Sequence, residues 1–359
     1  MLTASPGRNP GFAVAARGFS VIELMVAVAI SLLLLSGIVA IFVSSKSSYE
    51  TNERFSRIQE NGRFALDAVM TDVRSSGFVG CARQPNYLST SLNNQTTLQW
   101  NFLAGSVAGF EATGTDTWSP AMDASIAGPL SGSDVLVVRV PVRERVASPL
   151  TADMGTSSGT LQVAPGSGWT AGDIALAYSC EAISVFQVTG FTSGGVISHD
   201  INSGAAPQNA NNNLSYTYRQ HVTRVVPVET IVYFVAPSTR VADAIDPAPA
   251  GTTSLWRRRG LAAVEELVEG IEQIQIQYGV DTNGDVIVDE YRTADAVSDW
   301  NDVISVGVAM LVRSLEEYGT ETDARTYTLL DVDVAAPADR RMREVFTATA
   351  SIRNRVRVN

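Results

Sequence analysis

The sequence predicts an α+β protein in which a long amino-terminal α-helix packs on a large, mostly antiparallel, β-rich globular head. Three observations lead to this prediction. Residues 24–43 form an uncharged apolar run. From Phe55 to Val73, apolar residues recur three or four positions apart, which is the period of a helix. From Pro85 onward, short segments rich in Val, Ile, Thr and Tyr alternate with Gly, Ser, Asn and Pro, a pattern typical of strands and turns.

The apolar run extends from Leu24 to Val43 and reads LMVAVAISLLLLSGIVAIFV. A helix of about 20 residues crosses the hydrocarbon core of a bilayer. A secretory signal has an apolar region of only about 7–15 residues, so this run is predicted to remain as a single membrane span. Arg8 and Arg17 precede it without an acidic residue. Positive charge favours the cytoplasmic side, so the rest of the chain is predicted to be exported.

The helix is predicted to continue beyond the membrane segment, because no proline occurs between Phe19 and Gln84. Gly77 and Gly80 indicate its end near Ser76. An apolar stripe at helical spacing is expected to pack on the head. The stripe consists of Phe55, Ile58, Gly62, Leu66, Val69 and Val73.

The head is predicted to consist mainly of strands, without internal repeats. The sequence leaves open a division into two sheet lobes and does not place their boundary. One helical stretch is expected from Leu261 to about Glu269. Residues 204–213 are predicted to form a polar loop, and residues 243–253 a Pro/Ala/Gly-rich loop or linker. The clearest strands are Asp134–Val142, Ile174–Tyr178, Ile183–Val188, Thr223–Val235 and Asp302–Val312.

Composition excludes several classes of function. With 26 Lys and Arg against 37 Asp and Glu, the formal net charge is −11, so direct binding to nucleic acid is not expected. Two cysteines and two histidines leave little room for a zinc centre or a histidine-based active site. His199 and His221 stand alone and are interpreted as structural or surface residues. No residue constellation supports a membrane-anchored enzyme or a solute-binding domain, so the chain is predicted not to be an enzyme.

The residues before the apolar run carry a specific resemblance. Arg17-Gly18-Phe19-Ser20-Val21-Ile22-Glu23-Leu24 resembles the class III leader of type IV pilins and pseudopilins. The resemblance implies that prepilin peptidase cleaves between Gly18 and Phe19 and methylates the new amino terminus of Phe19. It also implies that Glu23 pairs with the terminal amine of a neighbouring subunit during assembly, which neutralises two charges inside lipid. An unpaired carboxylate otherwise makes the free energy of membrane insertion less favourable by roughly 2.5–3.5 kcal/mol at the bilayer centre, and by less near a helix end.

These observations divide the chain into four parts. Residues 1–18 are the leader peptide, and residues 19–43 are the half of the helix in the membrane or filament core. Residues 44–80 are the amphipathic half, and residues 81–359 are the periplasmic β-rich head.

Cys81 lies just after the predicted helix and Cys180 lies among the strands. Outside the cytoplasm a disulfide between them persists, and we favour it over two free buried thiols. Closing a loop of about 100 residues stabilises the fold by up to roughly 4.7 kcal/mol in the chain-entropy model. The bridge is expected to fasten the end of the helix to the sheet.

The carboxy-terminal third resembles the PilW family of minor pilins. That resemblance implies a low-abundance subunit that joins other minor pilins, the major pilin and a large tip adhesin. It also implies a role in priming type IV pilus assembly at the inner membrane, a place at or near the pilus tip, and support of twitching motility and adhesion. The alternative is a J-type minor pseudopilin of type II secretion. The blocks that carry the resemblance are Ser254–Gly260, Val264–Asp285, Asp299–Trp300, Val306–Ser314 and Phe346–Arg355.

Two short polar features remain open. Asp281, Asn283, Asp285 and Asp289 place oxygen ligands at spacings that suit calcium, although not those of an EF-hand. The alternative is a hairpin in which Asn283-Gly284 forms a type I′ turn between Ile274–Val280 and Val286–Tyr291. No cofactor is required, and calcium is the only candidate. The run Arg257–Arg259 is either solvated or faces an acidic partner.

Overall fold

The structure is a computed structural model with one long helix and several β-sheets, which confirms the predicted α+β class. Helix α1 spans Val21–Ser75, close to the predicted limits. The chain divides into two compact units, Met1–Arg54 and Phe55–Asn359. The residues described are 18, 20–81, 87–126, 128–201, 204, 206–239, 251–318 and 320–352.

The described residues of the second unit contain one large sheet whose strand order is β1-β8-β7-β11-β4-β2-β3, with β5 and β12 also paired to β11 and β13 paired to β12. Its pairings are antiparallel except for that of β1 with β8. The strands are β1 (Tyr87–Thr90), β2 (Val107–Gly114), β3 (Thr117–Ser119), β4 (Val135–Pro141), β5 (Ser148–Pro149), β7 (Ile174–Tyr178), β8 (Ala182–Gln187), β11 (Arg224–Pro237), β12 (Thr253–Arg259) and β13 (Glu265–Glu269).

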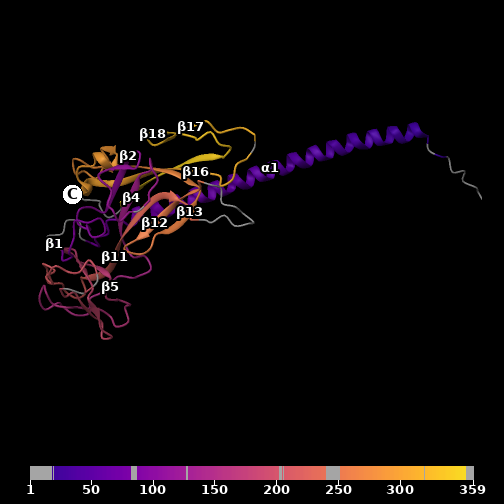
Figure 1. Cartoon of the computed structure of the whole chain (residues 1–359). Coiled ribbons are helices and arrows are strands. Elements are labelled where there is room, and N and C mark those ends of the chain that lie inside the picture. Colours follow the sequence, from indigo (N-terminus) through magenta and orange to yellow (C-terminus); the bar gives the residue numbers. More distant parts are fainter. Residues whose placement is uncertain are drawn as a thin grey trace, which may run out of the picture. The chain divides into compact units, whose positions relative to one another are not determined.

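A second sheet has the order β15-β14-β16-β19 and is antiparallel throughout. Its strands are β14 (Ile271–Val280), β15 (Glu290–Arg292), β16 (Val303–Arg313) and β19 (Arg343–Ser351). Two smaller sheets complete the described strands: β6 (Leu161–Gln162), β10 (Val196–Ser198) and β9 (Gly190–Phe191), and the hairpin of β17 (Thr326–Leu329) and β18 (Val332–Ala335). Figure 1 shows these strands in the colours of the sequence.

All five strands predicted with clear bounds are present, as β4, β7, β8, β11 and β16. The predicted helix from Leu261 to Glu269 is wrong. This segment turns after Gly260 and then forms β13, which pairs with β12. The Glu266 carboxylate accepts hydrogen bonds from the hydroxyls of Ser238 and Ser254, both at 2.5 Å. Tertiary pairing therefore overrides a local preference for helix.

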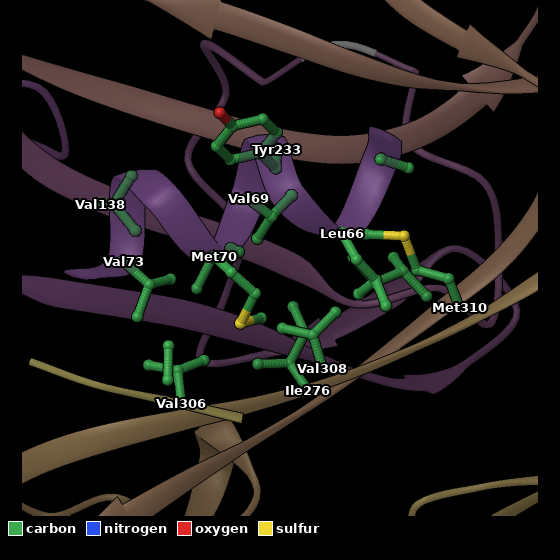
Figure 2. Packing of buried hydrophobic residues seen from close by; sticks show 14 of the residues in the cluster. Leu66, Val69, Met70, Val73, Val138, Tyr233, Ile276, Val306, Val308 and Met310 are labelled. Carbon is green, nitrogen blue, oxygen red and sulfur yellow. The ribbon is translucent and has the colours of Figure 1, made fainter. Parts of the chain in front are cut away.

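The second half of α1 packs between the two large sheets (Figure 2). Val69 lies against Tyr233 of β11, whereas Met70 and Leu66 face β14 and β16 on the other side. The stripe from Ile58 to Val73 is buried as predicted. Phe55 is the exception: it is 42% exposed, one turn before the first buried position. The core cluster shared by the helix and both sheets is thus the centre of the head.

The remaining predicted stripe residue, Gly62, has no room for a side chain. A Cβ atom there would lie 2.6–2.7 Å from three ring atoms of Phe346 on β19. Alanine is the better helix former by roughly 1 kcal/mol, but overpacking costs about 1–3 kcal/mol. We expect Gly62→Ala to lower the melting temperature of the full chain in detergent. Gly37→Ala, where no atom lies within 4 Å, is the matched control; an unchanged melting temperature for Gly62→Ala contradicts the prediction.

The helix ends at Ser75, and Gly77 follows in the left-handed conformation at φ +67°. A left-handed glycine at this position is a common helix terminator. Cys81 then forms the predicted disulfide with Cys180, 99 residues later. The bridge fastens the chain that leaves α1 to the segment between β7 and β8.

A second apolar cluster lies under the segments around β6, β7, β8 and β10, and it includes Trp169, Phe186 and Tyr218. His199 is buried there, and its Nε2 lies 2.7 Å from the Gly159 carbonyl oxygen. The predicted polar loop at residues 204–213 includes the fully buried Asn209, which hydrogen-bonds to Gln187. Residues 243–250 of the second predicted loop lie outside the described residues.

Candidate functional site

The first half of α1 is the candidate membrane segment. It is the one helix among the described residues that is long and apolar enough to cross a bilayer, and none of its most apolar window is buried within the structure. Large apolar side chains such as Leu33 and Phe42 are exposed along it. An apolar surface this large is unfavourable in water and requires lipid or other subunits around it.

Glu23 lies in the first turn of this helix. Its Oε2 accepts a hydrogen bond from the Ser20 backbone N–H at 3.1 Å, and the Ser20 hydroxyl accepts one from Ile22 N–H at 3.3 Å. Ser20 and Glu23 thus form a capping box, whose S-x-x-E signature the sequence analysis did not use. Gly18 is exposed, whereas Phe19 and the leader residues 1–17 lie outside the described residues.

Asp72 is a buried carboxylate on the face of α1 that packs on the head, and the sequence analysis did not identify it. The Tyr233 hydroxyl and the Arg143 guanidinium each donate to it at 2.5 Å. Burial, together with the nearby Asp72 carboxylate, raises the pKa of Tyr233 well above its usual range, so the phenol stays a donor. Together, these bonds anchor the helix to β11 and to the segment that follows β4.

The arginine run on β12 is not simply solvated. All three guanidinium groups are engaged within the head: Arg257 with Glu265, Arg258 with Ser125, and Arg259 with Glu144 and Glu229. These contacts brace the large sheet, so the interpretation of the run as freely solvated is wrong, and the acidic partner stays a prediction.

Asp134 joins the two large sheets. Its carboxylate accepts from the backbone N–H of Ala112 on β2 at 2.9 Å and of Ile276 on β14 at 2.8 Å. Burial, followed by the nearby Glu111 carboxylate, raises the pKa of Asp134 to about 8. Burial is also the largest cause that raises the pKa of Glu111 to about 7. The junction therefore holds protons that the unfolded chain releases at lower pH.

This junction predicts a pH dependence of stability. Both acids have folded-state pKa values above their unfolded values of about 4, so they favour the folded state below pH 4. Their contribution is lost as the pH rises from about 4 through 8. We expect the melting temperature to fall across this range by several degrees. The double variant Asp134→Asn/Glu111→Gln should flatten the slope, whatever its absolute stability; a slope unchanged from wild type contradicts the prediction.

The loop from Asp281 to Asp289 connects β14 to β15, and its antiparallel flanks confirm a hairpin. The predicted turn type and second strand are wrong. Asn283 does not have the positive φ that a type I′ turn requires, whereas Gly284 and Val286 do, and β15 begins only at Glu290. Asp281 holds the loop by accepting from the backbone N–H groups of Gly284, Asp285 and Val286.

The calcium candidates face their own loop rather than a common point. The Asp289 carboxylate accepts from Thr282 and Asn283, and Asp285 accepts from the Ile287 N–H. Among the residues that the structure describes, no group of three His, Cys, Asp or Glu side chains is placed to hold a metal. To bind calcium, these carboxylates would therefore have to give up the hydrogen bonds that they accept within the loop.

Two measurements separate the structural role of this loop from calcium binding. Asp281→Ala should lower thermal stability even in EDTA, because three amide N–H groups lose their acceptor, at about 0.5–1.5 kcal/mol for a typical hydrogen bond. If calcium binds, it should raise the melting temperature of the wild type and not that of Asp285→Ala. An identical wild-type melting temperature in calcium and in EDTA contradicts calcium binding.

Comparison with known families assigns the carboxy-terminal part of the head. Residues 232–354 match the family model described as Type IV Pilus-assembly protein W, PilW. This region of the chain is therefore similar to the PilW family. The match runs from within β11 through β19 and includes the buried face of β14 and β16 that contacts α1. The curated proteins and the solved structures give no significant match.

This similarity supports a part in type IV pilus assembly. It agrees with a membrane-anchoring helix that precedes a disulfide-bonded head. The matched family is described as a pilus-assembly protein, so the surfaces and the amino terminus of the chain are the features of interest.

Proposed function

We propose that this chain is a minor pilin that primes assembly of the type IV pilus and is incorporated at or near its tip. Before assembly it is a single-pass protein of the inner membrane with a periplasmic head. Prepilin peptidase removes residues 1–18 and methylates Phe19. Other minor pilins, the major pilin and a large tip adhesin are its partners, and twitching motility and adhesion depend on the resulting fibre.

The observation that carries the proposal is the exposed apolar half of α1, with its one carboxylate, Glu23, in the first turn. In a bilayer this surface is satisfied by lipid, and in a filament by the equivalent helices of neighbours. Glu23 loses the water that surrounds it before insertion, so an ammonium group from the neighbouring subunit becomes its favourable partner. Transfer from lipid to filament then needs no change in the fold of the head.

The mass of the amino-terminal peptide tests the processing step. In cells with prepilin peptidase, we expect a peptide that starts at methylated Phe19. In cells without the enzyme, the intact leader should remain. An intact leader in both strains, or a cut near Ser45 in either, contradicts the proposal.

Deletion of the gene tests the machine in which the subunit acts. Loss of surface fibres that the wild-type gene restores supports the pilus role. Normal fibres with loss of exoprotein secretion favour the alternative, a minor pseudopilin of type II secretion.

A further inference from the structure

Strand β19 is the longest strand at a sheet edge in the part of the chain that the structure describes. It pairs with β16 in nine consecutive positions, from Arg343 opposite Arg313 to Ser351 opposite Ser305, without a bulge. On its other side no described strand pairs with it. One complete row of backbone donors and acceptors therefore lies along this edge.

The register shows which residues make up that row. Ile352 N–H donates to the Ile304 carbonyl oxygen at 2.8 Å, and these residues continue the β16–β19 register. Hydrogen-bonded pairs alternate along an antiparallel ladder, so Ala350, Ala348 and Phe346 point their backbone groups at β16. The backbone groups of Val345, Thr347, Thr349 and Ser351 consequently point away from the sheet. The side chains of Thr347, Thr349 and Ser351 are exposed as well.

This edge lacks the features that usually prevent strand addition. Native edges are kept apart by shortness, charge, proline or bulges. In the described sheets the edge strand β13 carries three glutamates, β15 has only three residues with charges at both ends, and β1 and β3 have four and three residues. From Val345 to Ser351 β19 has no charge and no proline, and it is rich in threonine and alanine. Long, regular and uncharged, it resembles a pairing surface more than a protected edge.

We propose that the edge of β19 binds an extended strand of a neighbouring pilus subunit, which adds to the sheet β15-β14-β16-β19. The inference rests on the proposed minor-pilin function. The segment that fits is proline-free and uncharged where it faces Thr347 and Thr349, since main-chain hydrogen bonds supply affinity in this mode of recognition. The edge is uncharged from Val345 to Ser351, so it offers no countercharge to a charged segment, which favours an uncharged one.

The test removes the outward N–H groups and leaves the β16 ladder intact. In Thr347→Pro/Thr349→Pro the lost donors face solvent, a position where a strand tolerates proline. Thr347→Lys/Thr349→Lys keeps the donors but places charge on the edge. Thr347→Val/Thr349→Val is the matched control, because it changes the same side chains and keeps both donors without charge. Each full-length variant replaces the wild-type gene in piliated cells, and its melting temperature in detergent checks the fold.

For the proline and lysine variants, we expect the amount of the subunit in sheared pili and in complexes with other pilus subunits to fall at least tenfold. Their melting temperature should be unchanged. The valine variant should match the wild type. If the proline variant does not fold, the lysine variant decides. Wild-type incorporation of the folded lysine variant overturns the inference.

Three further outcomes show which part of the argument fails. If the full chain sediments in detergent as a dimer that only the proline and lysine variants dissociate, the occupant is a second copy and the proposed partner is wrong. If deletion of the gene leaves fibres unchanged, the proposed function fails. If deletion abolishes fibres and every edge variant restores them, the edge inference alone fails.

Discussion

Replacing Arg343 with alanine is expected to lower the free energy of unfolding of the head by about 3–5 kcal/mol, because it breaks the ion pairs of a buried guanidinium group. The Arg343 side chain is fully buried. Its Nε and Nη2 donate to Glu272 at 2.6 and 3.1 Å, and its Nη1 and Nη2 donate to Asp339 at 2.7 and 2.8 Å. Both carboxylates are thus held by two parallel bonds, the strongest form of such a pair.

The Arg343 network joins three segments of the chain. Glu272 lies on β14 and Arg343 begins β19, whereas Asp339 belongs to the segment after the β17–β18 hairpin. The guanidinium therefore fastens that segment to one end of the second sheet. Beside it, the carboxyl group of Asp323 hydrogen-bonds to Arg325 and Tyr327, and these bonds hold its pKa far below the usual range.

The measurement is urea unfolding of the full chain in detergent, monitored by tryptophan fluorescence. Two further variants serve as comparisons. Arg343→Lys keeps the charge and loses the planar fork, so an intermediate loss is expected. Arg340→Ala is the matched control. Arg340 pairs with Glu317 at 2.7 Å with about half its side chain exposed, and such surface pairs contribute about 0–1 kcal/mol. Equal losses for Arg340→Ala and Arg343→Ala contradict the argument.

Glu23→Ala is expected to leave membrane insertion intact and to prevent entry of the subunit into the fibre. Removing a carboxylate makes the apolar helix easier to insert. It also removes the group that we propose pairs with a neighbour's amino terminus, so we expect at least a tenfold loss from sheared pili. Within the subunit the change removes one capping hydrogen bond at the start of α1, an effect of about 0.5–2 kcal/mol on the local helix end.

Two further variants distinguish charge from shape. Glu23→Gln keeps the size of the side chain and removes its charge, so it should fail like alanine if ion pairing drives assembly. Glu50→Ala removes an exposed carboxylate of the same helix that pairs with Lys46 at 3.7 Å, and it should assemble normally. Normal piliation and unchanged co-purification of Glu23→Ala with other pilus subunits would show that the pair is dispensable.

The sequence by itself determined the features that depend on local pattern. An uncharged run long enough for a bilayer, an apolar stripe at helical spacing and strands rich in branched residues can each be recognised from neighbours along the chain. Helix α1, the buried stripe from Ile58 to Val73 and the strands β4, β7, β8, β11 and β16 follow from them. The membrane segment is the clearest case, because its composition alone requires a nonaqueous environment.

Tertiary structure decided the features whose partners are far apart in sequence. Residues 261–269 have a helical pattern, yet Glu265–Glu269 is a strand because β12 offers a ladder and serine hydroxyls bind Glu266. From the local sequence, Asp72 is expected on the exposed face of a helix. In the fold it accepts hydrogen bonds from Tyr233 and Arg143. From the local sequence, Arg343 is expected to be an exposed charge at the start of a strand. In the fold it is paired with Glu272 and Asp339, which lie on other elements. A buried charge is stable only with its partners in place, so the fold, rather than the local sequence, decides where such a charge is buried.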